Sequence, residues 1–241
     1  MAPRTPRPTP PHSGVTIAGA AAALGLALSP EQCLRLERYL ALVEEWRARV
    51  ALTGADAAET ASVLVAGALC VLPFVPDSGR LADLGSGAGV PGIPIAVMRP
   101  RLRVVLTDAA RKKAAFLEIA ARGLALDNVD VVQARAEDFG RDPAHRGRYD
   151  VVTARALAPV RVLAEYALPL LRLGGEAVLA KGRGAHDEVR AAARAVELLG
   201  GEAAVQPPRA KMCSPVVVIR KIAPTPAAYP RRAGIPQRRP L

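Results

Sequence analysis

The sequence predicts an α/β protein built on a doubly wound, mostly parallel sheet, and three observations lead to this fold class. From Arg80 onward, short apolar runs alternate with segments of helical pattern. The first run ends in an acid followed by a glycine-rich turn, at residues 81–89. The last two runs have no helical pattern between them. Alternation is typical of parallel strands joined by crossover helices, and the final pair predicts a hairpin with an antiparallel strand on the sheet edge.

Each apolar run is short enough for one strand, and together they predict a seven-stranded sheet. The expected strands cover residues 81–84, 104–107, 129–133, 150–154, 176–180, 203–206 and 216–219. The expected helices between them cover residues 92–98, 109–123, 160–171 and 185–199.

An N-terminal helical cap is expected at residues 15–75, ahead of the sheet domain at 76–223. Ser29 suits a helix N-cap and Pro30 the first helical position. The apolar residues from Leu34 to Trp46 then recur at helical spacing among charged residues, which predicts an amphipathic helix. A second helix is expected at about residues 57–71.

Both ends of the chain are rich in proline. Residues 1–14 are predicted to be a disordered tail. Residues 224–241, here called the C-terminal arm, hold five prolines and four arginines and no acid. We expect no packed core there. The arm is therefore either a solvated tail or a phosphate-binding segment, and its unneutralised charge favours the second interpretation.

The net charge of +11 and the isoelectric point near 10.4 point to a polyanionic partner. Nucleic acid comes first and an acidic membrane surface second, with arginine enrichment from a GC-rich genome as the alternative. No run of 18 strongly apolar residues is present, so we expect no membrane span. The three cysteines Cys33, Cys70 and Cys213 lack metal-ligand spacing. We interpret them as reduced thiols of a cytoplasmic protein without a metal.

Ligands of open parallel sheets bind beyond the carboxyl ends of the strands. At the first strand end lie Gly85, Gly87 and Gly89, whose spacing lets a ligand approach the backbone closely. Asp83 precedes this loop and can hydrogen-bond its amides. Asp108, after the second strand, can accept both hydrogen bonds of a ribose diol or cap the next helix.

The next two strand ends continue this series. Ala136, Glu137 and Asp138 follow the third strand, where a side chain or amide can reach an adenine edge; the alternative is a solvated acidic loop. Arg155 follows the fourth strand at the mouth of the expected site. Four successive strand ends thus each supply a glycine or polar contact suited to a nucleotide-like cofactor.

Two cofactors compete for this site. An NAD site requires G-x-G-x-x-G, whereas valine stands here at the third glycine position, residue 90. An acid two residues before G-x-G-x-G instead resembles the S-adenosylmethionine loop of class I methyltransferases, which also have an antiparallel last strand. The favoured cofactor is therefore S-adenosyl-L-methionine.

Longer motifs narrow this resemblance to one family. The chain resembles the bacterial 16S ribosomal RNA guanine-N7 methyltransferases, the glucose-inhibited division protein B family, from about Gln32 to its end. The motifs are GSGAGVPGIP from Gly85, ARAE from Ala134, TARALA from Thr153, AKG from Ala180 and YPRRAGIP from Tyr229. The resemblance implies a class I fold, methylation of a guanine in the decoding-region loop of 16S rRNA, and 16S rRNA or the small ribosomal subunit as partner. It further implies cofactor contacts at Gly85, Val90, Ala136, Glu137 and Arg155.

The chain departs from the family pattern in its N-terminal cap. Arg47 stands after Trp46 where the family commonly has asparagine, Ala51-Leu52-Thr53 replaces Asn-Leu-Thr, and residues 64–69 carry no polar group. A paralogue that methylates another RNA or a small molecule, or a non-catalytic RNA-binding relative, therefore stays an alternative.

Methylation at guanine N7 needs no general base, because N7 carries a free lone pair. Accordingly His12, His145 and His186 lie away from the strand ends, and we interpret them as surface residues. Arg155 is the candidate catalytic residue, through the methionyl carboxylate or the guanine edge. Lys181, Arg231 and Arg232 are the candidate RNA-binding residues, and a monomer is the expected state.

Overall fold

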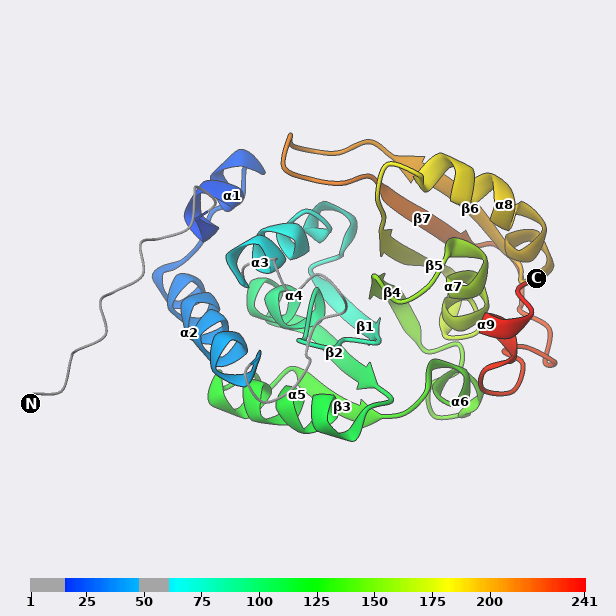
Figure 1. The fold of residues 1–241 in the computed structure, drawn as a ribbon, viewed down its shortest axis with the longest axis horizontal. Coiled ribbons are helices and arrows are strands. Elements are labelled where there is room, and N and C mark those ends of the chain that lie inside the picture. Colours follow the sequence, from blue (N-terminus) through cyan, green and yellow to red (C-terminus); the bar gives the residue numbers. More distant parts are fainter. Residues whose placement is uncertain (1–15, 48–60) are drawn as a thin grey trace, which may run out of the picture.

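The computed structural model describes residues 16–47 and 61–241 of the 241-residue chain, with the side chains of 61–63 left out. Helices and strands alternate after a helical N-terminal segment, as Figure 1 shows. The helices are α1 (Ile17–Ala23), α2 (Pro30–Arg47), α3 (Ala61–Leu69), α4 (Gly92–Met98), α5 (Arg111–Gly123), α6 (Ala136–Arg141), α7 (Val160–Ala167), α8 (Ala185–Leu198) and α9 (Ile235–Arg238), with a 3-10 turn η1 at Leu72–Phe74. The strands are β1 (Ser78–Leu84), β2 (Arg101–Asp108), β3 (Val129–Gln133), β4 (Tyr149–Arg155), β5 (Leu171–Ala180), β6 (Gly201–Gln206) and β7 (Val216–Lys221).

The seven strands form one sheet in the order β3-β2-β1-β4-β5-β7-β6. Strands β1 to β5 are parallel, and β7 runs antiparallel to both β5 and β6. The predicted hairpin is confirmed, but the expected place of the antiparallel strand is wrong. Strand β7 lies one position inside the sheet, because it pairs with β5, and β6 forms the edge.

Helices cover both faces of the sheet and enclose two apolar cores (Figure 1). Side chains alternate along each strand, so Val104 and Leu106 of β2 enter one core and Val105 enters the other. The first core lies under α4 and α5 and includes residues of α1 to α3. The second lies under α7 and α8.

The N-terminal cap begins its long helix as predicted. Ser29 Oγ accepts a hydrogen bond from the backbone N–H of Gln32 (3.1 Å), and Gln32 Oε1 accepts one from the N–H of Ser29 (2.9 Å). This reciprocal pair is a capping box. Helix α2 buries Leu36, Tyr39 and Val43 against the rest of the fold. The expectations for residues 1–14, for the first residues of the 57–71 helix and for the 51–53 motif fall outside the described residues.

One expectation about the cysteines is wrong. Cys70, just after α3, and Cys213, just before β7, form a disulfide across 143 residues of sequence, while Cys33 is a free cysteine. The two residues pair because the fold brings the end of the cap beside the β6–β7 connection, a proximity that their sequence spacing does not reveal.

The C-terminal arm is also more ordered than expected. It buries Thr225, Pro230 and Pro236, ends in the short helix α9, and lies along α7 (Figure 1). The arm packs without an apolar core of its own because other elements bind its backbone. Among the described residues, no helix is long and apolar enough to cross a membrane.

Candidate cofactor site

The register of the sheet brings four predicted strand ends together. Leu84 of β1 pairs with Thr107 of β2 on one side and with Ala154 of β4 on the other. The next residues along the three strands are Gly85, Asp108 and Arg155, so these lie at one level of one sheet edge. Strand β3 ends beside Asp108, at Gln133. This is the edge where open parallel sheets bind ligands.

Three positions of the glycine loop have a backbone conformation that favours glycine. Gly85, Gly87 and Gly89 have φ of +62°, +54° and +88°, in the left-handed region that favours glycine. A Cβ on Gly85 would stand 2.7 Å from Leu157 Cδ1, and one on Gly89 would stand 2.5 Å from Ile93 Cδ1. Glycine is therefore required at Gly85 and Gly89 both by the backbone conformation and by the side chains of Leu157 and Ile93, which fill the space a Cβ would take.

The carboxylate of Asp83 bonds the first residue of α4 and a residue of β4, rather than the loop amides expected from its place before Gly85. Its Oδ2 accepts from the N–H of Gly92 (3.2 Å), and its Oδ1 accepts from the hydroxyl of Thr153 (2.8 Å). Burial raises the pKa of Asp83 to about 6, against the lowering effect of these hydrogen bonds. The side chain is fully buried, so Asp83 joins the start of α4 to β4 and has no face toward solvent.

Asp108 joins the ends of β1 and β2. Its Oδ2 accepts from the N–H of Gly87 (3.0 Å) and its Oδ1 from the N–H of Ala110 (2.8 Å). Helix α5 begins only at Arg111, and its N-cap is Ala110 without a side-chain bond, so Asp108 is not the N-cap. A carboxylate offers about four acceptor positions, which leaves capacity for a diol beside the two amides.

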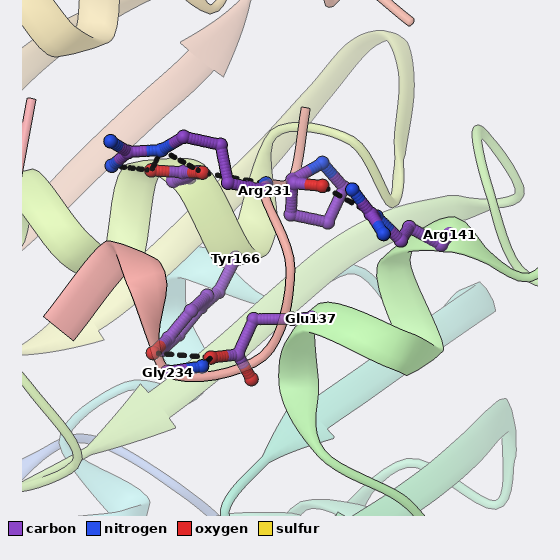
Figure 2. Close-up of polar contacts among 7 residues, drawn as sticks. Glu137, Arg141, Tyr166, Arg231 and Gly234 are labelled. Carbon is purple, nitrogen blue, oxygen red and sulfur yellow. Dashed lines mark hydrogen bonds and ion pairs between the residues drawn. The ribbon is translucent and has the colours of Figure 1, made fainter. Parts of the chain in front are cut away.

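The third strand end is a helix rather than a loop. Ala136 and Glu137 begin α6, and Glu137 is buried. Its Oε1 accepts from the hydroxyl of Tyr166 (3.2 Å) and from the N–H of Gly234 in the C-terminal arm (2.7 Å). Figure 2 shows Tyr166 and Gly234 converging on one oxygen of Glu137 while the other oxygen points away from both. The interpretation of Glu137 as a solvated acid is thus wrong.

Arg155 ends β4 and reaches toward the N-terminal cap. A Cβ on Gly67 of α3 would stand 3.9 Å from the guanidinium carbon of Arg155. Burial raises the pKa of Tyr39 in α2, Asp83 raises it further, and the charge of Arg155 opposes both. Arg155 therefore lies between the sheet edge and the cap, a position suited to contact both a cofactor and its acceptor.

The comparisons with known proteins agree with this geometry. The profile of the GidB family, described as rRNA small subunit methyltransferase G, matches residues 32–212. A protein named ribosomal RNA small subunit methyltransferase G from Roseiflexus sp. is 46% identical over 226 residues, covering 92% of this chain and 97% of that protein. Its namesake from Rubrobacter xylanophilus is 42% identical over 230 residues, covering 91% and 87%.

The chain belongs to the rRNA small subunit methyltransferase G family. A crystal structure of a protein from Corynebacterium glutamicum shares the fold with a TM-score of 0.52 at 20% identity, covering 77% of this chain and 90% of that one. The sheet is that of class I methyltransferases, and its last strand, β7, is antiparallel, as the resemblance implies.

The structure separates the three cations that were expected to bind RNA in this family member. Lys181 Nζ donates to the carbonyl of Ala158 (2.9 Å) and pairs with Glu188 (2.8 Å), and only 11% of its side chain is exposed. Arg231 forms a two-pronged ion pair with Glu165. Arg232 is exposed. The first two cations thus have partners within the protein, whereas Arg232 faces solvent.

Three tyrosine or threonine hydroxyls near the strand ends were missed by sequence reasoning. Tyr39 donates to the carbonyl of Ala88 in the glycine loop (2.6 Å), Thr153 bonds Asp83, and Tyr166 bonds Glu137. Tyr39 and Tyr166 stand on buried helix faces and gave no signal beyond core packing, and Thr153 was noted only as the first residue of the TARALA motif. His145 was expected at the surface but is partly buried, with Nδ1 2.7 Å from the hydroxyl of Tyr149.

A separate cavity of about 420 Å³ opens at the amino ends of β2 and β3, on the sheet edge away from the glycine loop. It is lined by Arg35, Pro100, Arg101, Arg103, Ala125, Asp127 and Asn128. Because ligands of this fold class bind at the carboxyl ends, we do not assign the cofactor to it. Among the described residues, no group of three or more His, Cys, Asp and Glu side chains could hold a metal ion.

Proposed function

We propose that the protein transfers a methyl group from S-adenosyl-L-methionine to N7 of a guanine in 16S rRNA. One observation carries this proposal. Gly85, Asp108 and Arg155 lie side by side at the carboxyl ends of three neighbouring strands, and the chain belongs to this family. The net charge of +11 supports a polyanionic acceptor. We propose the cytoplasm as the compartment, because the acceptor is part of the ribosome.

The backbone at Gly85 and Val90 would line the methionyl side of the cofactor, and Gly87 would keep the loop open above it. Asp108 would accept hydrogen bonds from the ribose diol. Ala136 and Glu137 would face the adenine. Asp83 would act indirectly, without touching the cofactor, by accepting the hydrogen bond from the N–H of Gly92. When bound, the cofactor supplies a methyl group on a positively charged sulfur, ready for transfer to a lone pair.

The remaining chemistry is positioning. Guanine N7 loses no proton on methylation, so the protein must hold the base in line with the methyl group and exclude water. Good orientation alone is worth about 7–11 kcal/mol in favourable intramolecular systems. Arg155 is the residue placed to orient either the cofactor carboxylate or the guanine edge, and it is the proposed catalytic residue. Arg232 is the proposed phosphate contact on the arm, because Lys181 and Arg231, the other two candidates, are already paired with Glu188 and Glu165.

The deciding experiment is transfer of a labelled methyl group to purified small ribosomal subunits and to naked 16S rRNA, followed by mapping of the modified base. We expect 7-methylguanine in 16S rRNA. Label on another RNA base, or on a small molecule only, would refute the acceptor. Absence of S-adenosylmethionine binding in calorimetry would refute the enzyme function altogether. Binding to rRNA should weaken steeply as salt rises, since phosphate contacts release counterions.

A further inference from the structure

The C-terminal arm is bound through its backbone by side chains from the sheet domain. Arg141 Nε donates to the carbonyl of Pro230 (2.7 Å). Arg146 donates to the carbonyls of Tyr229 (2.6 Å) and Thr225 (3.1 Å). A Cβ on Gly140 of α6 would stand 3.0 Å from Pro230 Cγ, so the proline ring packs directly on that helix. These contacts place the arm beside α6, although they involve backbone groups that any sequence offers.

The arm also forms an ion pair with the sheet domain, between Arg231 and Glu165, and the carboxylate of this pair is deeply buried. Glu165 lies on α7 with 1% of its side chain exposed. Arg231 Nε and Nη2 donate to its two oxygens (2.9 and 2.6 Å), and the N–H of Arg231 donates to Oε1 (2.8 Å). A buried carboxylate is strongly destabilised when it lacks a positive partner. The ion pair therefore holds Arg231 of the arm in one position against Glu165 of α7.

Three residues beyond Arg231 the arm reaches the cofactor side. The N–H of Gly234 donates to Glu137 Oε1 over 2.7 Å, and Gly234 has φ of +82°, a conformation that favours glycine. Tyr166, the neighbour of Glu165 on α7, donates to the same oxygen. Glu137 is thus held by one group from the arm and one from α7 (Figure 2).

We propose that Arg231 is a positioning residue for the cofactor site: its ion pair with Glu165 sets the arm so that Gly234 fixes the carboxylate of Glu137. This inference rests on the proposed function, because it assumes that Glu137 faces the adenine of S-adenosylmethionine. It assigns Arg231 a role other than phosphate binding. Its guanidinium is engaged by Glu165 and only 25% of its side chain is exposed.

The first test is the affinity for S-adenosylmethionine, measured by calorimetry well below the melting temperature. Arg231→Ala should weaken binding at least tenfold, and Arg231→Lys, which keeps the charge but loses the fork, should weaken it less. Arg239→Ala removes an exposed arginine from the same arm and is the matched control, with unchanged affinity expected. Equal affinity of Arg231→Ala and wild type would overturn the proposal.

A variant with both Glu165→Gln and Arg231→Gln separates a loss of cofactor positioning from a loss of folding. It leaves no uncompensated charge in the buried site, so it should fold, and its cofactor affinity should still fall at least tenfold. A folded double variant with wild-type affinity would show that the pair only stabilises the fold, and would also overturn the proposal.

The second test uses the reciprocity of coupled sites. If the arm positions Glu137, then S-adenosylmethionine must in turn hold the arm, and it should slow tryptic cleavage after Arg232 and amide exchange at Gly234 in the wild type. The slowing should be reduced in Arg231→Lys and lost in Arg231→Ala. Cofactor binding without any protection of the arm would contradict the inference while leaving the proposed function intact. A wild type that binds no cofactor would refute both.

Discussion

The hydroxyl of Tyr39 donates a hydrogen bond of 2.6 Å to the carbonyl oxygen of Ala88, in the middle of the glycine loop. The donor belongs to α2 in the N-terminal cap and is fully buried, while the acceptor belongs to the turn after β1. The cap therefore contacts the glycine loop directly. Arg47, one of the departures from the family pattern, lies on the same helix as Tyr39.

Replacement Tyr39→Phe should lower both stability and cofactor affinity. Loss of the hydroxyl removes a buried bond, which costs about 1–3 kcal/mol, and it frees the loop to move. Urea unfolding and calorimetry with S-adenosylmethionine check the two effects. Tyr149→Phe is the matched control, because it removes a hydroxyl bonded to His145 at the amino end of β4. It should lower stability alone. A Tyr39→Phe protein that binds the cofactor as tightly as wild type would contradict the role of this contact.

Replacement Asp83→Asn should remove a pH dependence of folding. Burial raises the pKa of Asp83 from 3.8 to about 6. The folded protein therefore holds this proton more tightly than the unfolded chain, and the stability it contributes is present below about pH 3.8 and lost as the pH rises through about 6. The asparagine oxygen can still accept from Gly92. Relative to wild type, the variant should gain on the order of 2 kcal/mol between pH 4 and pH 7.

Urea unfolding of the cofactor-free protein at several pH values measures this difference. Asp130→Asn, at an exposed position of β3, controls for the loss of one negative charge. Parallel stability curves for Asp83→Asn and wild type would show that Asp83 does not titrate in this window.

Replacement Arg155→Ala should abolish methyl transfer without unfolding the protein. The side chain is only partly buried and stands at the end of β4, so its removal leaves both apolar cores intact. We expect a loss of at least a hundredfold in kcat/KM, with a melting temperature close to that of wild type. Arg194→Ala on the exposed side of α8 removes the same charge far from the strand ends. Retained transfer by Arg155→Ala would exclude it as the catalytic residue.

The disulfide predicts a response to reductant. A cross-link over 143 residues stabilises by about 5 kcal/mol in the chain-entropy model, and natural disulfides typically give about 2–5 kcal/mol. Dithiothreitol, or the double replacement Cys70→Ser and Cys213→Ser, should lower the melting temperature by several degrees. Alkylation followed by intact mass measurement should label one cysteine before reduction and three after it. Cys33→Ser should keep the melting temperature. Three labelled cysteines in the unreduced protein would refute the pairing.

The sequence predicts the sheet well because local signals agree at the strand ends. Strand β3 and helix α4 match their predictions residue for residue, at 129–133 and 92–98. The acid and glycine residues that follow β1 and β2 lie where the strand-end rule puts them. The antiparallel strand was expected at the sheet edge, which is wrong. The missing helical pattern between β6 and β7 predicts that the two pair as a hairpin, but it does not show which of them pairs with β5.

The contacts of the arm could not be predicted from its composition. Its prolines and arginines bury little apolar area, which is the criterion for a packed segment. Its stability comes instead from backbone carbonyls bound by Arg141 and Arg146, and from a counter-charge on a distant helix. The only available signal was Glu165, an acid among the apolar residues of α7 that needs a cationic partner when buried. The pairing of Cys70 with Cys213 likewise depends on tertiary proximity alone.

The bond between Glu137 and Gly234 joins residues 97 positions apart. During translation, β1 to β4 and the glycine loop leave the ribosome well before the arm does. A nascent chain that ends before residue 231 holds Glu165 without its cationic partner and Glu137 without the amide of Gly234. The strands can pair at that stage, but Glu137 gains the amide of Gly234 as a hydrogen-bond donor only after residues 231–234 have been made. Under the proposed function, affinity for the methyl donor should therefore appear only after residues 231–234 have emerged, rather than while the sheet is forming.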